Sequence, residues 1–171
     1  MPGVDDSVLV REATTGDELG VLRVLDAAML ESTATSAAVA RGDAFVAVAG
    51  GEDAAGDDGA VDGERIVGAL VLVPFSTVEL PDAVAERGDA VAGDVGMHVD
   101  AVAVRRRRRG QGIGRALVEA ALDRDRRLTV AFDPGVRAFY DALGFTIVLG
   151  SEDTTDGRAW AIRDTERSLT G

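Results

Sequence analysis

The segment from His98 to Leu122 holds the residues whose types and spacing most clearly suggest chemistry. It runs HVDAVAVRRRRRGQGIGRALVEAAL, from an apolar stretch into five consecutive arginines, three closely spaced glycines and a helix-like pattern. Backbone N–H groups at the start of a helix have no partner within it and carry partial positive charge. Glycines leave those groups open to a phosphate, and arginines add charge-assisted hydrogen bonds. Residues 109–114 are therefore predicted to bind a pyrophosphate.

The absence of lysine and the late position of these glycines in the chain exclude two common nucleotide-binding motifs. A P-loop needs Gly-x-x-x-x-Gly-Lys-Ser/Thr, and the chain has no lysine. A dinucleotide fingerprint would open the first βαβ unit, whereas these glycines fall late in the chain. The string fits Gln/Arg-x-x-Gly-x-Gly/Ala, with Arg109, Gly112 and Gly114 at the defining places. It resembles the acetyl-CoA-binding signature of the GCN5-related N-acetyltransferases, the GNAT family.

A second segment, PGVRAFYDALGF, resembles the closing Phe-Tyr-x-x-x-Gly-Phe segment of the same family, with Phe139, Tyr140, Gly144 and Phe145 in place. The order of expected elements from Val8 to about Asp164 also follows the family. The resemblance implies a single GNAT domain over residues 1–171 with an α/β (α+β) fold. Its mixed, mostly antiparallel twisted sheet would have about six to seven strands, with helices on both faces.

The resemblance also implies a cosubstrate, acetyl-CoA, and a set of residues that bind it without a metal. Backbone groups of Val102, Ala103 and Val104 would contact the pantetheine arm. The pyrophosphate would be wrapped by Arg109, Gly110, Gln111, Gly112, Ile113 and Gly114, assisted by Arg115. Phe139 and Asp133 complete the set, and Asp133 stands where the family often has an asparagine that contacts pantetheine. Residues Arg105–Arg108 would be divided between the 3′-phosphate of CoA and the acidic surface.

The implied reaction is transfer of acetyl from acetyl-CoA to a primary amine by direct attack, with a general base and a tyrosine general acid. On a strand, His98 and Asp100 share one face with Val102 and Val104. Either His98 or Asp100 could be the base; Asp100 could instead orient His98 or hold the substrate ammonium, and both could be a buried polar pair. Tyr140 falls where the family commonly places the acid, although it also lies on an apolar helical stripe.

The amino-acid composition limits which binding partners and which cellular location we expect. The net charge is −12, every basic residue is arginine, and aspartate is spread along the chain. This pattern predicts adaptation to concentrated salt, which screens self-repulsion, although such a surface could also attract cationic substrates. The charge disfavours a nucleic-acid partner despite the arginine run. Without cysteine, a signal peptide or a long apolar run, we expect a cytoplasmic protein with no metal and no membrane partner.

Periodicity and turn signals predict the elements that position these residues. Strands are expected at 8–14, 44–49, 65–75, 97–104 and 128–132, followed by a hairpin of 145–150 and 158–164. Helices are expected after Thr15, with a capping box to Glu18, and over 36–41, 113–123 and 134–143, the last capped by Asp133 and ended by Gly144. The predicted apolar stripes are Leu19, Leu22, Leu25 and Met29; Ile113, Ala116, Leu117, Ala120 and Ala121; and Val136, Phe139, Tyr140 and Leu143.

Two stretches and several functional points stay open at this level. Residues 50–64 are Gly/Asp-rich and predict a mobile hairpin loop, while 78–96 could be a substrate lid or a surface excursion with a helical turn near 82–87. The acceptor could be a protein N-terminus, a polyamine, an amino acid or an antibiotic-like amine. A homodimer is compatible with the resemblance. The alternatives are an inactive acyl-CoA-binding regulatory module and a transferase for another acyl group.

Overall fold

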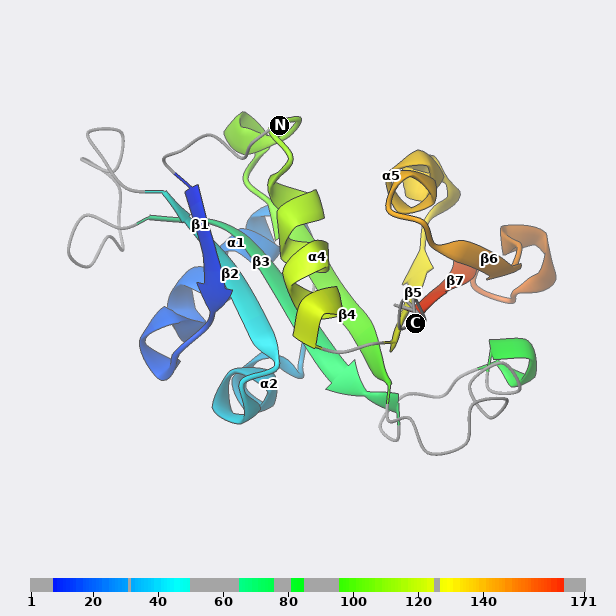
Figure 1. Ribbon diagram of the computed structural model, residues 1–171, viewed down its shortest axis with the longest axis horizontal. Coiled ribbons are helices and arrows are strands. Elements are labelled where there is room, and N and C mark those ends of the chain that lie inside the picture. The colour runs from blue at the N-terminus through cyan, green and yellow to red at the C-terminus, as the bar shows by residue number, and fades with distance from the viewer. Residues whose placement is uncertain are drawn as a thin grey trace, which may run out of the picture. The chain divides into compact units, whose positions relative to one another are not determined.

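The computed structural model describes residues 8–30, 32–49, 65–75, 81–84, 96–124 and 127–164. It has an α/β fold with a seven-stranded sheet in the order β1-β2-β3-β4-β5-β7-β6 (Figure 1). Strands β4 and β5 are parallel, and the pairs β1–β2, β2–β3, β5–β7 and β6–β7 are antiparallel. The predicted mixed, mostly antiparallel sheet is therefore confirmed. The elements are β1 (Val8–Glu12), α1 (Glu18–Ala27), α2 (Thr35–Arg41), β2 (Ala44–Ala49), β3 (Arg65–Pro74), β4 (Met97–Val104), α4 (Ile113–Arg124), β5 (Arg127–Phe132), α5 (Arg137–Ala142), β6 (Thr146–Leu149) and β7 (Ala159–Asp164).

The chain forms two compact units, each built from two separate stretches of sequence. The first unit comprises Met1–Leu72 and Asp100–Ala121, and the second comprises Val73–Val99 and Leu122–Gly171. A single domain over residues 1–171 stays a prediction. The predicted loop at 50–64 lies outside the described residues, as does most of the predicted lid at 78–96. Within that lid, residues 82–84 form a helical turn, as expected. No helix in the described ranges is long and apolar enough to cross a membrane.

In the first unit, α1 buries a different face from the predicted one. Val21, Val24 and Leu25 are buried, whereas Leu19 is 58%, Leu22 40% and Met29 92% exposed, so the predicted leucine stripe is wrong except at Leu25. The reason is a close approach between helix and sheet. A Cβ at Gly20 would collide with the side chain of Ile66 in β3, so the glycine side of α1 is the one that packs.

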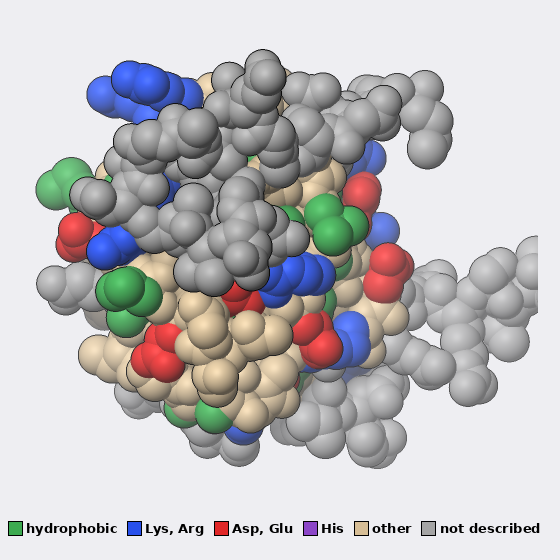
Figure 2. Space-filling model, turned by 90° about the vertical axis from the view of Figure 1, so that its left-hand side faces the viewer, with side chains coloured by type: hydrophobic (Ala, Val, Ile, Leu, Met, Phe, Trp, Pro, Cys, Tyr) green, Lys and Arg blue, Asp and Glu red, His purple; other side chains and the backbone are tan. Residues whose placement is uncertain are grey.

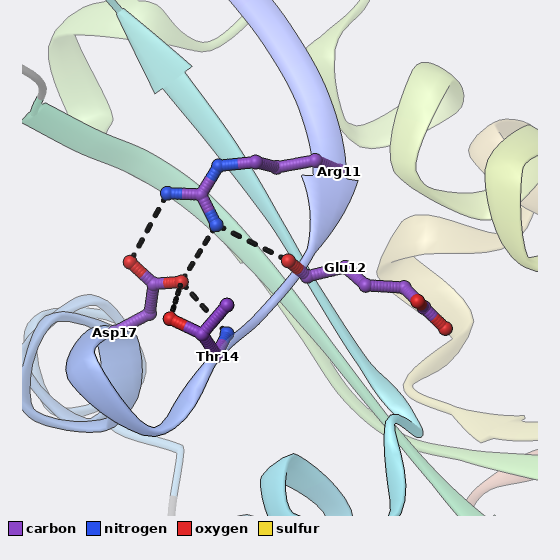
Figure 3. A network of polar contacts seen from close by, with 4 residues as sticks. All are labelled: Arg11, Glu12, Thr14 and Asp17. Carbon is purple, nitrogen blue, oxygen red and sulfur yellow. Dashed lines mark hydrogen bonds and ion pairs between the residues drawn. The ribbon is translucent and has the colours of Figure 1, made fainter.

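The N-terminal cap of this helical segment involves a short polar network (Figure 3). The capping box joins Thr14 and Asp17, one residue earlier than the predicted pair of Thr15 and Glu18. An Oδ atom of Asp17 accepts hydrogen bonds from the Thr14 N–H at 2.8 Å and from its hydroxyl at 3.0 Å. The guanidinium of Arg11 donates to both carboxylate oxygens, at 2.6 and 3.2 Å. These bonds, that of Arg11 first, outweigh burial and lower the pKa of Asp17.

Replacing Asp17 with asparagine is expected to cost about 1–2 kcal/mol of unfolding free energy, because the substitution removes the charge from both the cap and the ion pair. The folded-state pKa is lowered, so this stabilisation is present above about pH 4 and is lost as the pH falls through the folded value. Denaturant unfolding of the wild type and of Asp17→Asn from about pH 2 to about pH 7 checks this prediction. The difference between their unfolding free energies should shrink as the pH falls. Asp43→Asn, which loses an ion pair to Arg41 at 2.9 Å, is the control and should cost less than about 0.5 kcal/mol.

Strand β3 carries a bulge that determines which residues face each layer of the first unit. Its register places Gly68 opposite Ala47 and Ile66 opposite Val48, so Val67 is an extra residue without a partner in β2. The extra residue puts Ile66 and Gly68 on opposite faces. Ile66 meets α1, and a Cβ at Gly68 would lie 3.0 Å from Cγ2 of Ile113 in α4. Figure 1 shows α4 in front of these strands and α1 behind them.

Most other predicted elements of the two units are confirmed. The apolar run of β3 is buried from Val67 to Val73, and the strand ends at Pro74. Helix α4 buries Ile113, Leu117 and Ala121, as predicted, whereas Ala116 and Ala120 of the same predicted stripe are half-buried. Before α5, Asp133 accepts a hydrogen bond from the Gly135 N–H at 3.1 Å, and Pro134 occupies the first turn. The stripe of α5 is wrong only at Val136, which is 47% exposed because it precedes the helix in a 3-10 turn.

Candidate functional site

The glycine turn of the first unit joins the end of β4 to the start of α4. Gly110 and Gly112 each have φ of +80°, and a Cβ at either position would meet nothing within 4 Å. Glycine is needed there for its backbone conformation, since another residue would pay about 1–2 kcal/mol. The first intrahelical bond of α4 runs from the Ala116 N–H to the Gly112 carbonyl at 3.0 Å. The three preceding N–H groups, of residues 113–115, therefore have no partner within the helix.

The arginine run divides into one anchored side chain and several exposed ones. Arg105 donates from its backbone N–H to the Val67 carbonyl at 2.8 Å and from Nε to the Ile66 carbonyl at 2.9 Å. Arg106 and Arg107 are exposed and Arg108 is half-buried in a 3-10 turn. Across the described residues, no carboxylate pairs with any of these last three. The expectation that some of them pair with the acidic surface finds no support among the described carboxylates.

Two other predicted phosphate residues have local partners. Arg109 is exposed and donates from Nε to the Val104 carbonyl at 3.2 Å. Arg115 pairs with Glu119 at 3.0 Å, one helical turn further on, with both side chains more than half exposed. An exposed pair of this kind contributes little stability and can be exchanged for a phosphate at small cost. Figure 2 shows basic and acidic side chains interspersed over one face of the molecule where its residues are described.

His98 is a buried residue of the second unit. It is 8% exposed, and its Nδ1 lies 2.9 Å from the Thr129 hydroxyl oxygen, on the residue that pairs with it across β4 and β5. Its ring centroid lies 5.2 Å from that of Trp160, at an interplanar angle of 31°. Thr129 and Trp160 were missed by sequence reasoning. The one available signal was a polar residue inside the apolar strand LTVAF.

Asp100 belongs to the first unit and is exposed. Its Oδ2 accepts a hydrogen bond from the Ser32 hydroxyl at 2.5 Å, so the connection between α1 and α2 contacts β4. The same serine borders a hollow of about 460 Å³ whose lining includes Leu22, Asp26 and Leu30. Nothing in the sequence signalled Ser32. His98 and Asp100 thus have different hydrogen-bond partners, and the alternation of β4 leaves Asp100, Val102 and Val104 more exposed than Ala101 and Ala103.

Tyr140 lies in an aromatic cluster of the second unit. It is 5% exposed, with its ring centroid 4.7 Å from that of Phe132, 5.0 Å from Phe139 and 5.5 Å from Phe145. Burial raises the pKa of Tyr140 to about 12. No described residue hydrogen-bonds its hydroxyl, and no fully buried side-chain oxygen in the described ranges lacks a partner. The hydroxyl is therefore not fully buried, although the ring is packed.

The titration of Tyr140 can be observed directly, because it is the single tyrosine of the chain. Phenolate absorbance is expected to stay low in the native protein up to about pH 10 and to rise towards the folded pKa of about 12. Since the folded pKa is raised, stability is lost as the pH rises from the unfolded value through the folded one. Tyr140→Phe should remove that loss. A native titration with its midpoint near pH 10 would contradict the burial.

Two further predicted cofactor residues, Asp133 and Phe139, lie in the helical segment that contains α5. Asp133 is exposed at its cap, and Phe139 is half-buried edge-on against Tyr140. The described residues contain no group of three His, Cys, Asp or Glu that could hold a metal ion. The contacts of all these residues with CoA stay predictions.

The family model described as an acetyltransferase (GNAT) domain matches residues 41–147, more than half of the chain. The chain belongs to the GNAT family. This confirms the family predicted from the two motifs. No curated protein sequence matches this GNAT chain.

Solved structures share the GNAT fold at low sequence identity. A crystal structure of the NatC complex bound to Gag peptide and CoA has a TM-score of 0.64 and 13% identity, covering 94% of this chain and 99% of that one. Arabidopsis thaliana Naa50 in complex with the bisubstrate analogue CoA-Ac-MVNAL gives 0.61 and 16%, covering 94% and 99%. Ard1 from Thermoplasma volcanium gives 0.59 and 18%, also covering 94% and 99%. At these identities the likeness shows the shared fold.

Proposed function

We propose that this GNAT protein transfers the acetyl group of acetyl-CoA to a primary amine by direct attack. The observation that carries the proposal is the start of α4, where free N–H groups follow two glycines with φ of +80° and lie beside arginines without a described carboxylate partner. The similar NatC and Naa50 structures, which contain CoA or a CoA-based bisubstrate analogue, support the same cosubstrate.

The cofactor-binding roles follow the local geometry. The amides of residues 113–115, with Arg109–Gly112 before them, bind the pyrophosphate. The exposed Arg106 and Arg107 are available to the 3′-phosphate. Backbone groups of Val102–Val104 and the cap at Asp133 contact the pantetheine arm; an aspartate there keeps an acceptor but lacks the amide donor of asparagine.

The chemical step needs one group to take a proton and one to donate. The amine nitrogen attacks the thioester carbon, a C–N bond forms and the C–S bond breaks. Asp100 is the base or ammonium-holding group, because its carboxylate is exposed whereas His98 is packed between Thr129 and Trp160. Tyr140 donates the proton that the leaving sulfur gains. The acceptor is an amine-bearing small molecule or a peptide.

The alternative is a GNAT-like module that binds acyl-CoA without catalysis. Two observations favour it: His98 is buried against its neighbours, and the Asp100 carboxylate is already engaged by Ser32. An acyl group other than acetyl is a further variant of the proposal. Homodimer formation, cytoplasmic location, a salt-adapted origin and the lack of nucleic-acid or membrane partners stay predictions.

Calorimetry of CoA in molar KCl and an amine and peptide panel with acetyl-CoA test the proposal together. We expect heat of CoA binding and CoA release with at least one acceptor. Binding without turnover on any amine would support the regulatory module, and no CoA binding would contradict both functions.

Gly112→Ala provides a site-specific control for the calorimetry. It should weaken CoA binding about tenfold, because the strain falls on the turn that holds the pyrophosphate. Gly157→Ala is its matched partner, since Gly157 has φ of +73° and also has nothing within 4 Å of its Cβ position, but lies between β6 and β7. It should bind CoA as the wild type does.

A further inference from the structure

We propose that Arg105 is a positioning residue that fixes the phosphate-binding turn to the bulge of β3 and is not a ligand for a CoA phosphate. The inference rests on the proposed function, because it assigns a role in CoA binding. It also distinguishes one arginine from four neighbours that the sequence presents as equivalent.

The β3 bulge supplies two backbone acceptors beside the end of β4. Val67 is the extra residue of the bulge, and the ladder to β2 is interrupted there. The Ile66 carbonyl accepts from Nε of Arg105 at 2.9 Å, and the Val67 carbonyl accepts from its backbone N–H at 2.8 Å. A single residue therefore occupies two successive carbonyls of the bulge.

The same arginine begins the turn that follows. Its carbonyl accepts from the Arg108 N–H at 2.8 Å, which closes the 3-10 turn of Arg106–Arg108. The far end of the connection is fixed to the same place on β3, because Ile113, the first residue of α4, packs on Gly68. Both ends of residues 106–112 are thus attached to residues 66–68, and the turn between them is held in shape before any ligand binds.

One identified atom of the Arg105 side chain makes the bond to the bulge. The bond to Ile66 uses Nε, the nitrogen nearest the backbone in arginine. Glutamine carries an N–H donor the same number of bonds along its side chain but has no charge. Lysine keeps the charge, but its nitrogen lies one bond further out on a flexible chain. Arg105→Gln and Arg105→Lys therefore separate positioning from charge.

Calorimetry of the two variants with CoA and with dephospho-CoA, which lacks the 3′-phosphate, tests the inference. Positioning predicts that Arg105→Gln binds both ligands nearly as the wild type does, and that Arg105→Lys loses about fivefold for both. The reverse order, or a loss that disappears with dephospho-CoA, would make Arg105 a phosphate ligand and overturn the inference. Arg158→Lys, at an exposed arginine just before β7, is the control and should change neither affinity.

Amide hydrogen exchange of the ligand-free proteins gives a second readout that does not require CoA. Arg105→Lys should exchange faster at residues 106–116 than Arg105→Gln or the wild type, with the thermal midpoint of all three alike. Equal exchange in the three proteins would overturn the inference. If the wild type bound no CoA, the proposed function would fail, while the exchange rates would still decide whether Arg105 fixes the turn.

Discussion

Tyr140→Phe is expected to lower kcat roughly 10²-fold or more while leaving the affinity for CoA close to that of the wild type. The substitution removes only the hydroxyl and keeps the ring that packs on Phe132 and Phe145. With its pKa raised to about 12, the hydroxyl stays protonated throughout the neutral range and is always able to donate. A phenol is a weaker acid than a thiol, so we expect its proton to move only as the C–S bond breaks.

Steady-state kinetics and CoA calorimetry on the same protein samples check this prediction. Phe145→Leu is the matched control, because it disturbs the edge contact with Tyr140 but keeps the hydroxyl; its kcat should change by only a few fold. An unchanged kcat in Tyr140→Phe would limit this residue to packing, and a parallel loss of CoA affinity would indicate that the cluster shapes the cofactor site instead.

Asp100→Asn should also reduce kcat about 10²-fold, because the amide cannot take a proton from the amine or balance its charge. Asparagine still accepts a hydrogen bond from Ser32, so the connection between α1 and α2 should keep its contact with β4. CoA affinity should not change. Ser32→Ala retains the carboxylate and is expected to cost less than tenfold.

His98→Gln is the comparison that decides between the two candidate bases. We expect it mainly to destabilise the second unit, because it removes a ring packed against Trp160 and replaces the bond to Thr129. Trp160 is the single tryptophan, so its fluorescence reports on this packing directly. A larger loss of kcat in His98→Gln than in Asp100→Asn, with unchanged stability, would make His98 the base.

Elements with local signals were predictable from the sequence. Asp133 and Pro134 start the helical segment that contains α5, and Gly144, with φ of +82°, ends it. Each of these signals lies within a few residues of its effect. Strand β4 and the α4 stripe follow from short periodic patterns. The first helix was predicted correctly, but its buried face was not, because leucines and valines both recur at helical spacing. A contact between Gly20 and Ile66 decides between them.

The chemistry-bearing residues were identified from motifs, but their partners were not. Thr129 is 31 residues from His98, and Ser32 is 68 residues from Asp100. Nothing in the spacing of either pair predicts contact, since both depend on how the sheet and the helix connections fold. The arginine run shows the same limit, because five identical residues carry no information about which one is anchored. The capping box forms between Thr14 and Asp17 instead of the predicted pair, because Arg11 in the preceding strand donates a hydrogen bond to the Asp17 carboxylate.

Val67, the residue of β3 that has no partner in β2, constrains the number of residues in this strand more than the amino-acid type at its own position. Deletion of Val67 would restore a regular hydrogen-bond ladder between β2 and β3. The side chains that precede Val67 in β3 would then point to the opposite faces of the sheet. Ile66 would then point towards α4, and the space at Gly20 would be left empty. Many apolar side chains could replace this valine, but related chains should seldom insert or delete a residue at this point.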